Sequence, residues 1–197
     1  MTLDRFRPYV AGLLTPAINA ARALRLTPNF FSVGALLAAF AAGLAFYQGM
    51  LAVAIVLVAV NAIFDALDGA LARELKVASL RGDFIDHVAD RYADIAIITG
   101  IFAGGAASWE IGVFALTGVL MSSYMGTQGQ ALGVGRYYGG ILGRADRLVL
   151  LMIAGLLDLF LGMTVYGMPY LGWLLVFFGI FGHYTALQRF VYIWKRI

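Results

Sequence analysis

The sequence contains no cysteine, only two histidines and few charged residues. The absence of cysteine excludes disulfides and catalytic thiols, and two histidines cannot build a histidine-rich metal site. Charged residues make up 13% of the chain and hydrophobic residues 62%, whereas soluble domains have about 25% charged and about 45–50% apolar residues. This composition indicates an integral membrane protein.

Six apolar stretches are long enough to cross a bilayer as helices, which takes about 20 residues each. They cover residues 29–48, 50–73, 82–104, 111–135, 142–162 and 168–192. Residues 2–24 mix arginines with apolar side chains, a pattern that predicts an amphipathic helix in the membrane interface. We therefore expect an all-α fold, a polytopic membrane protein with six transmembrane helices and an N-terminal interfacial helix. Residues 1–197 would form a single membrane domain.

The basic residues lie on one side of the predicted membrane. The connections around residues 48–49, 107–110 and 158–167 contain no lysine or arginine. Because cytoplasmic loops are enriched in these residues, both termini are predicted to face the cytoplasm. The 24 glycines suit close helix packing in lipid, and the alternative is that some of them mark bends.

Acidic residues gather in and beside the second and third predicted spans. They are Asp65, Asp68, Asp83, Asp86, Asp90 and Asp94. A charged side chain at the bilayer centre costs about 2.5–3.5 kcal/mol, so these carboxylates must face a watery cavity or bind cations. Residues three or four apart share a helix face, and the short connection 74–81 makes the two helices antiparallel neighbours. The two halves of the cluster should therefore meet near the cytoplasmic interface.

Carboxylates without cysteine or histidine favour a hard cation such as Mg²⁺ or Mn²⁺. Small residues leave room for a ligand beside the acids, at Gly69, Ala72 and Gly82. Arg73 offers a positive charge to a phosphate. The alternative is that the acids only pair with Arg73, Arg81 and Arg91.

The segment from Asp65 to Asp90 resembles the signature of the CDP-alcohol phosphotransferase family, D-x2-D-G-x2-A-R-x8-G-x3-D-x3-D. Every fixed position is filled at the right spacing, by Asp65, Asp68, Gly69, Ala72, Arg73, Gly82, Asp86 and Asp90. The predicted spans and interfacial helix also match that family. The resemblance implies an enzyme that transfers a lipid phosphate group from a CDP-activated lipid to an alcohol and releases CMP.

The resemblance also implies roles for these positions. Two divalent ions, Mg²⁺ or Mn²⁺, would be held by Asp65, Asp68, Asp86 and Asp90. The cytidine nucleotide would be bound by Asp65, Asp68, Gly69, Ala72, Arg73 and Gly82. Asp90 would be the general base that takes the proton of the acceptor hydroxyl, while the ions neutralise the donor phosphates.

Arginines near the cytoplasmic ends of the fourth and fifth predicted spans indicate an acceptor that carries phosphate. They are Arg136, Arg144 and Arg147. A guanidinium group binds phosphate with two parallel hydrogen bonds, so these residues are candidate ligands of the acceptor phosphate. The alternative is that they only anchor the helices at the membrane surface.

Two tracts resemble members of the family that make inositol phosphate lipids. The stretch 143–148 resembles the R-x-x-R-L element of phosphatidylinositol phosphate synthases. Where bacterial members carry two arginines, this chain has Gly126 and Gln128, and the surrounding tract is closer to archaeal archaetidylinositol phosphate synthases. The implied acceptor is inositol 1-phosphate, with CDP-archaeol or CDP-diacylglycerol as donor. Glycerol phosphate is the alternative acceptor.

Several other polar residues lie in or beside the predicted spans. Asp83 and Asp94 either take part in the site or pair with Arg91, and His87 and His183 are interpreted as structural. A divalent cation transporter is the alternative function, since transporters also carry acids within the membrane. The expected partners are the CDP-lipid, inositol phosphate, membrane lipid and a second copy of the chain, without nucleic acid. The expected location is the cell membrane, with the site facing the cytoplasm.

Overall fold

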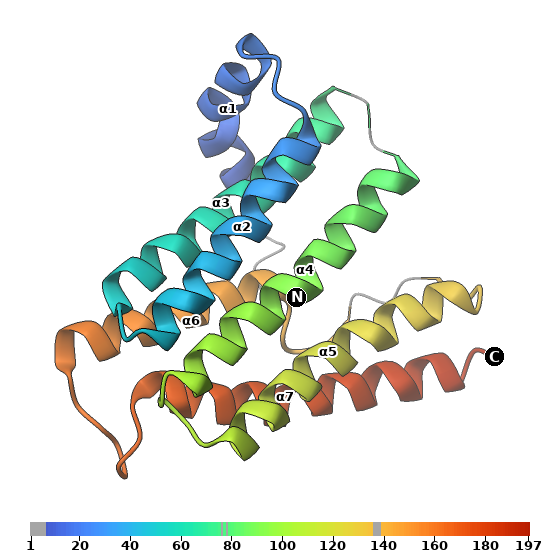
Figure 1. Ribbon diagram of the computed structural model, residues 1–197. Helices are drawn as coiled ribbons and strands as arrows, with labels where there is room; N and C mark the ends of the chain where they lie inside the picture. Colours follow the sequence, from blue (N-terminus) through green and yellow to red (C-terminus); the bar gives the residue numbers. More distant parts are fainter. Residues whose placement is uncertain (1–6, 76, 78, 136–138) are drawn as a thin grey trace.

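The structure is a computed structural model that describes residues 7–75, 77, 79–135 and 139–197, with only the backbone described at residues 7–11 and 13. Within these ranges the fold is all-α, as predicted, and strand pairing is confined to one isolated bridge between Val165 and Met168 (Figure 1). The helices are α1 Arg7–Ala23, α2 Pro28–Tyr47, α3 Leu51–Glu74, α4 Leu80–Ala103, α5 Trp109–Ala131, α6 Arg144–Leu161 and α7 Tyr170–Trp194.

The limits of α2 to α7 agree with the six predicted stretches to within a few residues, and the largest difference is at the end of α5. The interfacial helix predicted for residues 2–24 is described from Arg7 to Ala23, and residues 2–6 of that prediction lie outside the described residues. Helix α5 was expected to continue to residue 135 but ends at Ala131. Gly133 and Gly135 adopt positive φ angles of 76° and 88°, a conformation that ends a right-handed helix. At the start of α2, Pro28 occupies the first turn, where its fixed φ and missing N–H are well tolerated.

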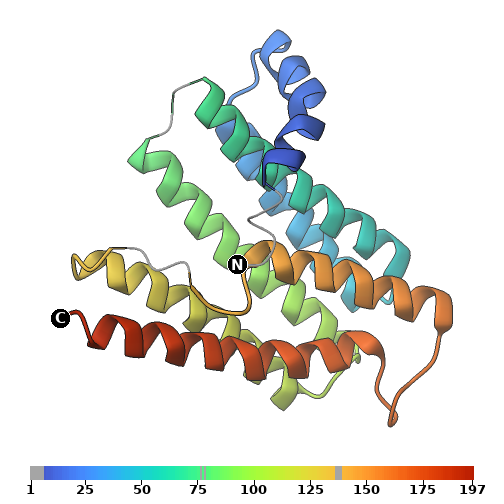
Figure 2. The same ribbon diagram turned by 180° about the vertical axis from the view of Figure 1, so that it is seen from behind.

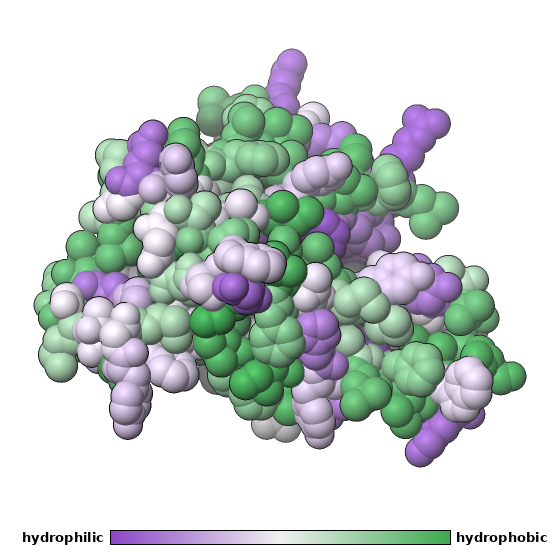
Figure 3. All heavy atoms as spheres, turned by 60° about the horizontal axis from the view of Figure 1, so that its bottom comes forward, coloured by the Kyte–Doolittle hydropathy of each residue, from purple (hydrophilic) through white to green (hydrophobic). Residues whose placement is uncertain are grey.

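Apolar surfaces of the helices face outward. Among the described residues, α2, α3 and α7 are long and apolar enough to cross a membrane, whereas the prediction was six spans. Large side chains such as Leu37 and Val56 remain more than half exposed. Figure 3 shows that hydrophobic residues cover large areas of one face of the molecule. Exposed apolar surface on this scale is typical of a protein that contacts lipid.

The central helix is α2, which packs along both α3 and α4. The two aspartate-bearing helices run in opposite directions (Figures 1 and 2) but do not pack along each other. The prediction that α3 and α4 are direct neighbours was therefore wrong, because α2 lies against both of them. On the other side of the molecule α5 packs along α7, and α6 contacts α3 and α7.

Glycines allow close contact between helices at two crossings. A Cβ atom added to Gly43 of α2 would overlap the main-chain carbonyl of Ala96 on α4, and one added to Gly100 would overlap the backbone of Gly43. The backbones of α5 and α7 approach in the same way at Gly118 and Gly182. The packing role predicted for glycine is confirmed at these crossings.

The short helix α1 holds the end of α3 that carries the aspartates. Ile18 and Ala21 of α1 are buried in a small apolar cluster with Leu67 and Leu71 of α3. An ion pair of 2.8 Å joins Arg22 to Glu74 at the end of α3. The position of this part of α3 is thus fixed from one side by α1 and from the other by α2.

Candidate metal centre

Carboxylates from α3 and α4 converge although the two helices are not packed together. One ligand oxygen from each of Asp65, Asp68 and Asp86 lies within 4.8 Å of the others. Asp68 is buried, and the hydroxyl of Ser32 on α2 donates a hydrogen bond of 2.8 Å to its Oδ2 atom. The helix that separates α3 from α4 therefore also orients one of the acids.

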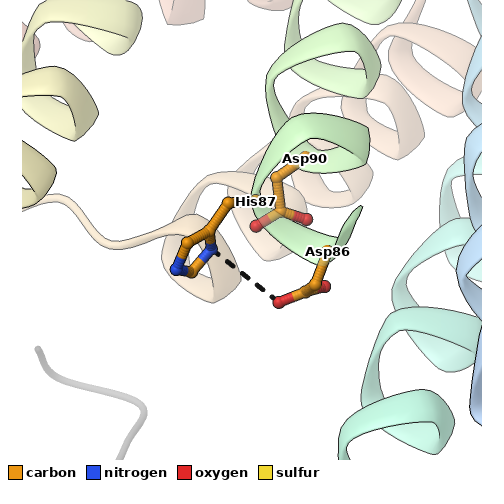
Figure 4. A group of neighbouring side chains, drawn as sticks. All are labelled: Asp86, His87 and Asp90. Atoms are coloured by element: carbon orange, nitrogen blue, oxygen red, sulfur yellow. Dashed lines mark ion pairs between the residues drawn. The ribbon is translucent and has the colours of Figure 1, made fainter. Parts of the chain in front are cut away.

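A second group of possible ligands lies on the first turns of α4. Atoms of Asp86, His87 and Asp90 also lie within 4.8 Å of one another (Figure 4). The His87 ring is 3.4 Å from the carboxylate of Asp83 and 3.9 Å from that of Asp86. His87, which the sequence suggested was only structural, is therefore at the edge of the acidic cluster. His183, by contrast, stacks on Phe114 far along the chain from these acids.

The aspartates line a small pocket between α2, α3, α4 and the start of α6. Its lining residues are Ser32, Ala35, Leu36, Asn61, Asp65, Asp68, Asp86, Ala89, Asp90, Ala93 and Arg144. Ala35, Ala89 and Ala93 contribute only short side chains to its walls. All four aspartates predicted to bind metal contribute to this one pocket.

Arg144, at the start of α6, reaches into the acidic cluster. Its Nη1 atom is 3.0 Å from Oδ1 of Asp90 and donates a hydrogen bond of 2.9 Å to the main-chain carbonyl of Asp90. Its Nη2 atom is 3.6 Å from the carboxylate of Asp65. Arg144 therefore connects α6 with both aspartate-bearing helices and offsets part of their negative charge.

Arg147 forms a buried ion pair with Asp94, one turn beyond Asp90. The Nη2 atom of Arg147 is 2.8 Å from Oδ2 of Asp94, and their side chains are 4% and 7% exposed. Removal of one partner from such a pair leaves an uncompensated charge and costs about 3–5 kcal/mol. The pair therefore fixes α6 against α4, next to the pocket.

The sequence did not reveal these contacts between α4 and α6. Of the arginines suggested as partners, Arg91 lies 3.3 Å from Asp90, whereas no ion pair among the described residues joins Arg73 or Arg81 to the aspartates. Arg144 and Arg147 are three residues apart in the first turn of α6, which places them on one face of the helix. This spacing was the sequence feature that could have indicated a shared role.

Several predicted nucleotide ligands lie outside the pocket lining. Arg73 lies beside Gly69, since a Cβ atom added to that glycine would be 3.3 Å from Nη1 of Arg73. Gly82 belongs to the first turn of α4, where its N–H donates a hydrogen bond of 3.1 Å to the hydroxyl of Ser79. Ala72 is half-buried on the last turns of α3. Arg136 lies outside the described residues.

The chemistry of the pocket fits a divalent cation. Carboxylate oxygens from two helices converge within reach of one ion, and hard cations such as Mg²⁺ and Mn²⁺ prefer oxygen ligands. A carbonyl oxygen of Asn61, which lines the same pocket, has no hydrogen-bond partner. The pocket therefore offers carboxylate and amide oxygens as ligands, and its donors are the guanidinium of Arg144 and the hydroxyl of Ser32.

Comparisons of the sequence point to one family. The profile of the CDP-alcohol phosphatidyltransferases matches residues 25–186. The chain is 33% identical to the archaetidylinositol phosphate synthase of Pyrococcus horikoshii over 99% of this chain and 98% of that protein. It is 30% identical to the enzyme of that name from Methanothermobacter thermautotrophicus, over 99% and 95%. The phosphatidylinositol phosphate synthase of Cutibacterium acnes is 33% identical over 77% of this chain and 76% of that protein.

Solved structures of the phosphatidylinositol phosphate synthase of Mycobacterium tuberculosis share the fold. The structure with CDP-DAG bound has a TM-score of 0.79 and 25% identity, covering 91% of this chain and 92% of that chain. The structure in complex with manganese and citrate has a TM-score of 0.80 and 25% identity, covering 91% and 88%.

Proposed function

Because the chain belongs to the CDP-alcohol phosphatidyltransferase family, we propose that it transfers a lipid phosphate group from CDP-archaeol to inositol 1-phosphate and releases CMP. The observation that carries the proposal is the convergence of Asp65, Asp68 and Asp86 in one pocket with Asp90. CDP-diacylglycerol is the alternative donor lipid.

The four aspartates of the pocket would hold two divalent cations, Mg²⁺ or Mn²⁺. Cations at this position would neutralise the phosphates of the donor, whose negative charge otherwise repels an attacking oxygen. The relative whose structure was solved with manganese supports this assignment. Asp65 and Asp68 are held by α2 and α3, and Asp86 and Asp90 by α4, so the helices fix the spacing of the ligands.

Asp90 is proposed as the general base. It would take the proton of the acceptor hydroxyl while the hydroxyl oxygen forms a bond to the lipid-bearing phosphorus and the bond to the CMP oxygen breaks. A positioned base contributes about 10²–10⁴-fold to such reactions. Arg144 and Arg91, at 3.0 and 3.3 Å from its carboxylate oxygens, would hold that carboxylate in place.

The nucleotide would lie at the cytoplasmic ends of α3 and α4. The proposed contacts are those of the family signature, namely Asp65, Asp68, Gly69, Ala72, Arg73 and Gly82. The solved relative with CDP-DAG bound supports a CDP-lipid as the donor. With Arg73 close to Gly69, a positive charge is available next to the acids for the leaving phosphate.

An acceptor with its own phosphate is supported by Arg144 and by the names of the relatives. Arg144 lines the pocket, and the relatives from archaea and bacteria are inositol phosphate lipid synthases. Arg144 is the proposed direct ligand. Binding of the acceptor phosphate by Arg147 and Arg136 stays a prediction. The pairing of Arg147 with Asp94 supports an indirect role, in which Arg147 holds the start of α6 and thereby Arg144 in place.

The proposed setting is a cell membrane crossed six times by α2 to α7, with α1 in the interface. Both termini and the pocket would face the cytoplasm, the 197 residues would form one domain, and two copies would associate. Support comes from the apolar outer surfaces and from the one-sided distribution of lysine and arginine.

The acceptor is tested by measuring CMP release from CDP-archaeol with inositol 1-phosphate, glycerol phosphate, serine and inositol. Inositol 1-phosphate is expected to give the highest kcat/KM, and Arg144→Ala is expected to raise its KM at least tenfold. Preference for glycerol phosphate would establish the alternative acceptor. Equal turnover of unphosphorylated inositol would contradict the role of Arg144. A divalent cation transporter would release no CMP.

A further inference from the structure

Asn61 is a fully buried polar residue on α3, one turn before Asp65. Its Nδ2 atom donates a hydrogen bond of 2.8 Å to the main-chain carbonyl of Ala35 on α2. A carbonyl oxygen can only accept, so this contact fixes which end of the carboxamide is nitrogen. The remaining atom, Oδ1, is therefore an acceptor, and it has no hydrogen-bond partner.

The unpaired oxygen belongs to the residues that line the aspartate pocket. A buried acceptor without a partner costs about 1–3 kcal/mol, so nearly all such atoms in folded proteins are hydrogen-bonded. The carboxylates of the pocket accept, the hydroxyl hydrogen of Ser32 is given to Asp68, and the guanidinium of Arg144 is directed to Asp65 and Asp90. No side chain that lines the pocket donates to Oδ1 of Asn61, so a bound molecule would supply the missing donor.

We propose that Oδ1 of Asn61 accepts a hydrogen bond from an O–H group bound in the pocket, which makes Asn61 a ligand-binding residue of this site. Two sources offer that group. One is a water molecule held by a divalent cation, since Mg²⁺ usually keeps several of its waters. The other is a hydroxyl of the acceptor alcohol, and this second source rests on the proposed function.

The test compares Asn61→Leu with Asn61→Asp in the purified full-length protein. Leucine removes both the donor and the acceptor, whereas aspartate keeps an acceptor and loses the donor to Ala35. Mn²⁺ affinity is measured by electron paramagnetic resonance without substrates, and the KM of inositol 1-phosphate is measured by CMP release. Ser122→Ala, a buried change on α5, is the matched control and should leave both quantities unchanged.

The expected result is at least a fivefold loss in Mn²⁺ affinity or a fivefold rise in the acceptor KM for Asn61→Leu, with values within twofold of wild type for Asn61→Asp. A change in Mn²⁺ affinity identifies the water, and a change in acceptor KM alone identifies the alcohol. Equal impairment of both variants would show that only the bond to Ala35 matters and would overturn the proposal. So would a shift confined to the KM of the CDP-lipid, or no shift at all.

If Asn61→Leu does not fold, Asn61→Ala takes its place in the comparison with Asn61→Asp, under the same criteria. The Mn²⁺ measurement does not depend on catalysis. It therefore reports on Asn61 even if no acceptor is turned over, which separates failure of this inference from failure of the proposed function.

Discussion

The two halves of α4 differ in how they meet the rest of the protein. In the second half, Gly100 contacts the backbone of α2 directly, and Ile97 and Ile101 are buried among apolar side chains. In the first half, Asp86 and Asp90 face α3 across a pocket instead of packing against it. The closely packed half holds the helix axis, so the charged half can face α3 across the pocket without packing against that helix.

Within the charged half, depth separates the acids into two kinds. Asp83 and Asp86 are more exposed and lie next to His87, whereas Asp90 and Asp94 are buried and contact arginines of α6. The outer acids are therefore accessible to an ion or to solvent. The inner acids depend on cationic partners, and breaking these contacts should have the larger effects.

Among the substitutions, the largest effect on activity is expected for Asp90→Asn. Loss of the proposed base should lower kcat by about 10²–10⁴-fold, while CDP binding stays near that of the wild type. Asp83→Asn, on the exposed first turn of the same helix, is the control and should keep at least half of the activity. Retained turnover in Asp90→Asn would exclude Asp90 as the base.

Asp94→Asn should mainly lower stability, because it leaves the guanidinium of Arg147 buried without its carboxylate partner. The free energy of unfolding should fall by about 3–5 kcal/mol, measured by thermal unfolding in detergent. The double variant Asp94→Leu and Arg147→Met removes both charges and should recover most of this loss. A stable Asp94→Asn protein with a raised KM for inositol 1-phosphate would instead favour direct binding of the acceptor by Arg147.

Gly100→Val tests the closely packed half of α4. The new side chain would overlap the backbone of Gly43, and overpacking of this kind typically costs about 1–3 kcal/mol. Because the change would move α4 relative to α2, we expect a lower unfolding temperature together with weaker Mn²⁺ binding in the distant pocket. Gly12→Ala, where a Cβ atom meets nothing within 4 Å, should leave both quantities unchanged. Unaltered Mn²⁺ binding in Gly100→Val would show that the two halves of α4 are independent.

Removal of divalent cations should abolish activity reversibly. Treatment with EDTA is expected to stop CMP release, and added Mg²⁺ or Mn²⁺ should restore it. Without a cation, the carboxylates of Asp65, Asp68 and Asp86 would repel the negatively charged phosphates of the donor. Asp68→Asn should raise the cation concentration needed for half-maximal activity. Full activity in EDTA would contradict the assignment of the pocket as a metal centre.

The helices and the acidic cluster could be predicted because they depend on local patterns. Long apolar runs gave the helix limits to within a few residues, and the spacing of Asp65, Asp68, Asp86 and Asp90 gave their common face. The insertion of α2 against both aspartate helices could not be predicted, since a short connection suggests neighbours but does not specify the third helix. The pairing of Arg147 with Asp94 joins residues 53 positions apart, and no local pattern reports such a contact.

The proposed role of Asn61 could not be predicted from the sequence either. Asn61 is uncharged and lies within an apolar run of α3, so no sequence pattern separates it from the packing residues around it. Its significance appears only when the hydrogen bond to Ala35 and the unpaired oxygen are seen together.

The most direct test of the account is CMP release by the purified protein from CDP-archaeol and inositol 1-phosphate, with and without Mg²⁺ or Mn²⁺. CMP should form only when donor lipid, acceptor and divalent cation are all present, in amounts equal to the inositol phosphate lipid formed. CMP release that continues without divalent cation, or none with any phosphorylated acceptor, would contradict it.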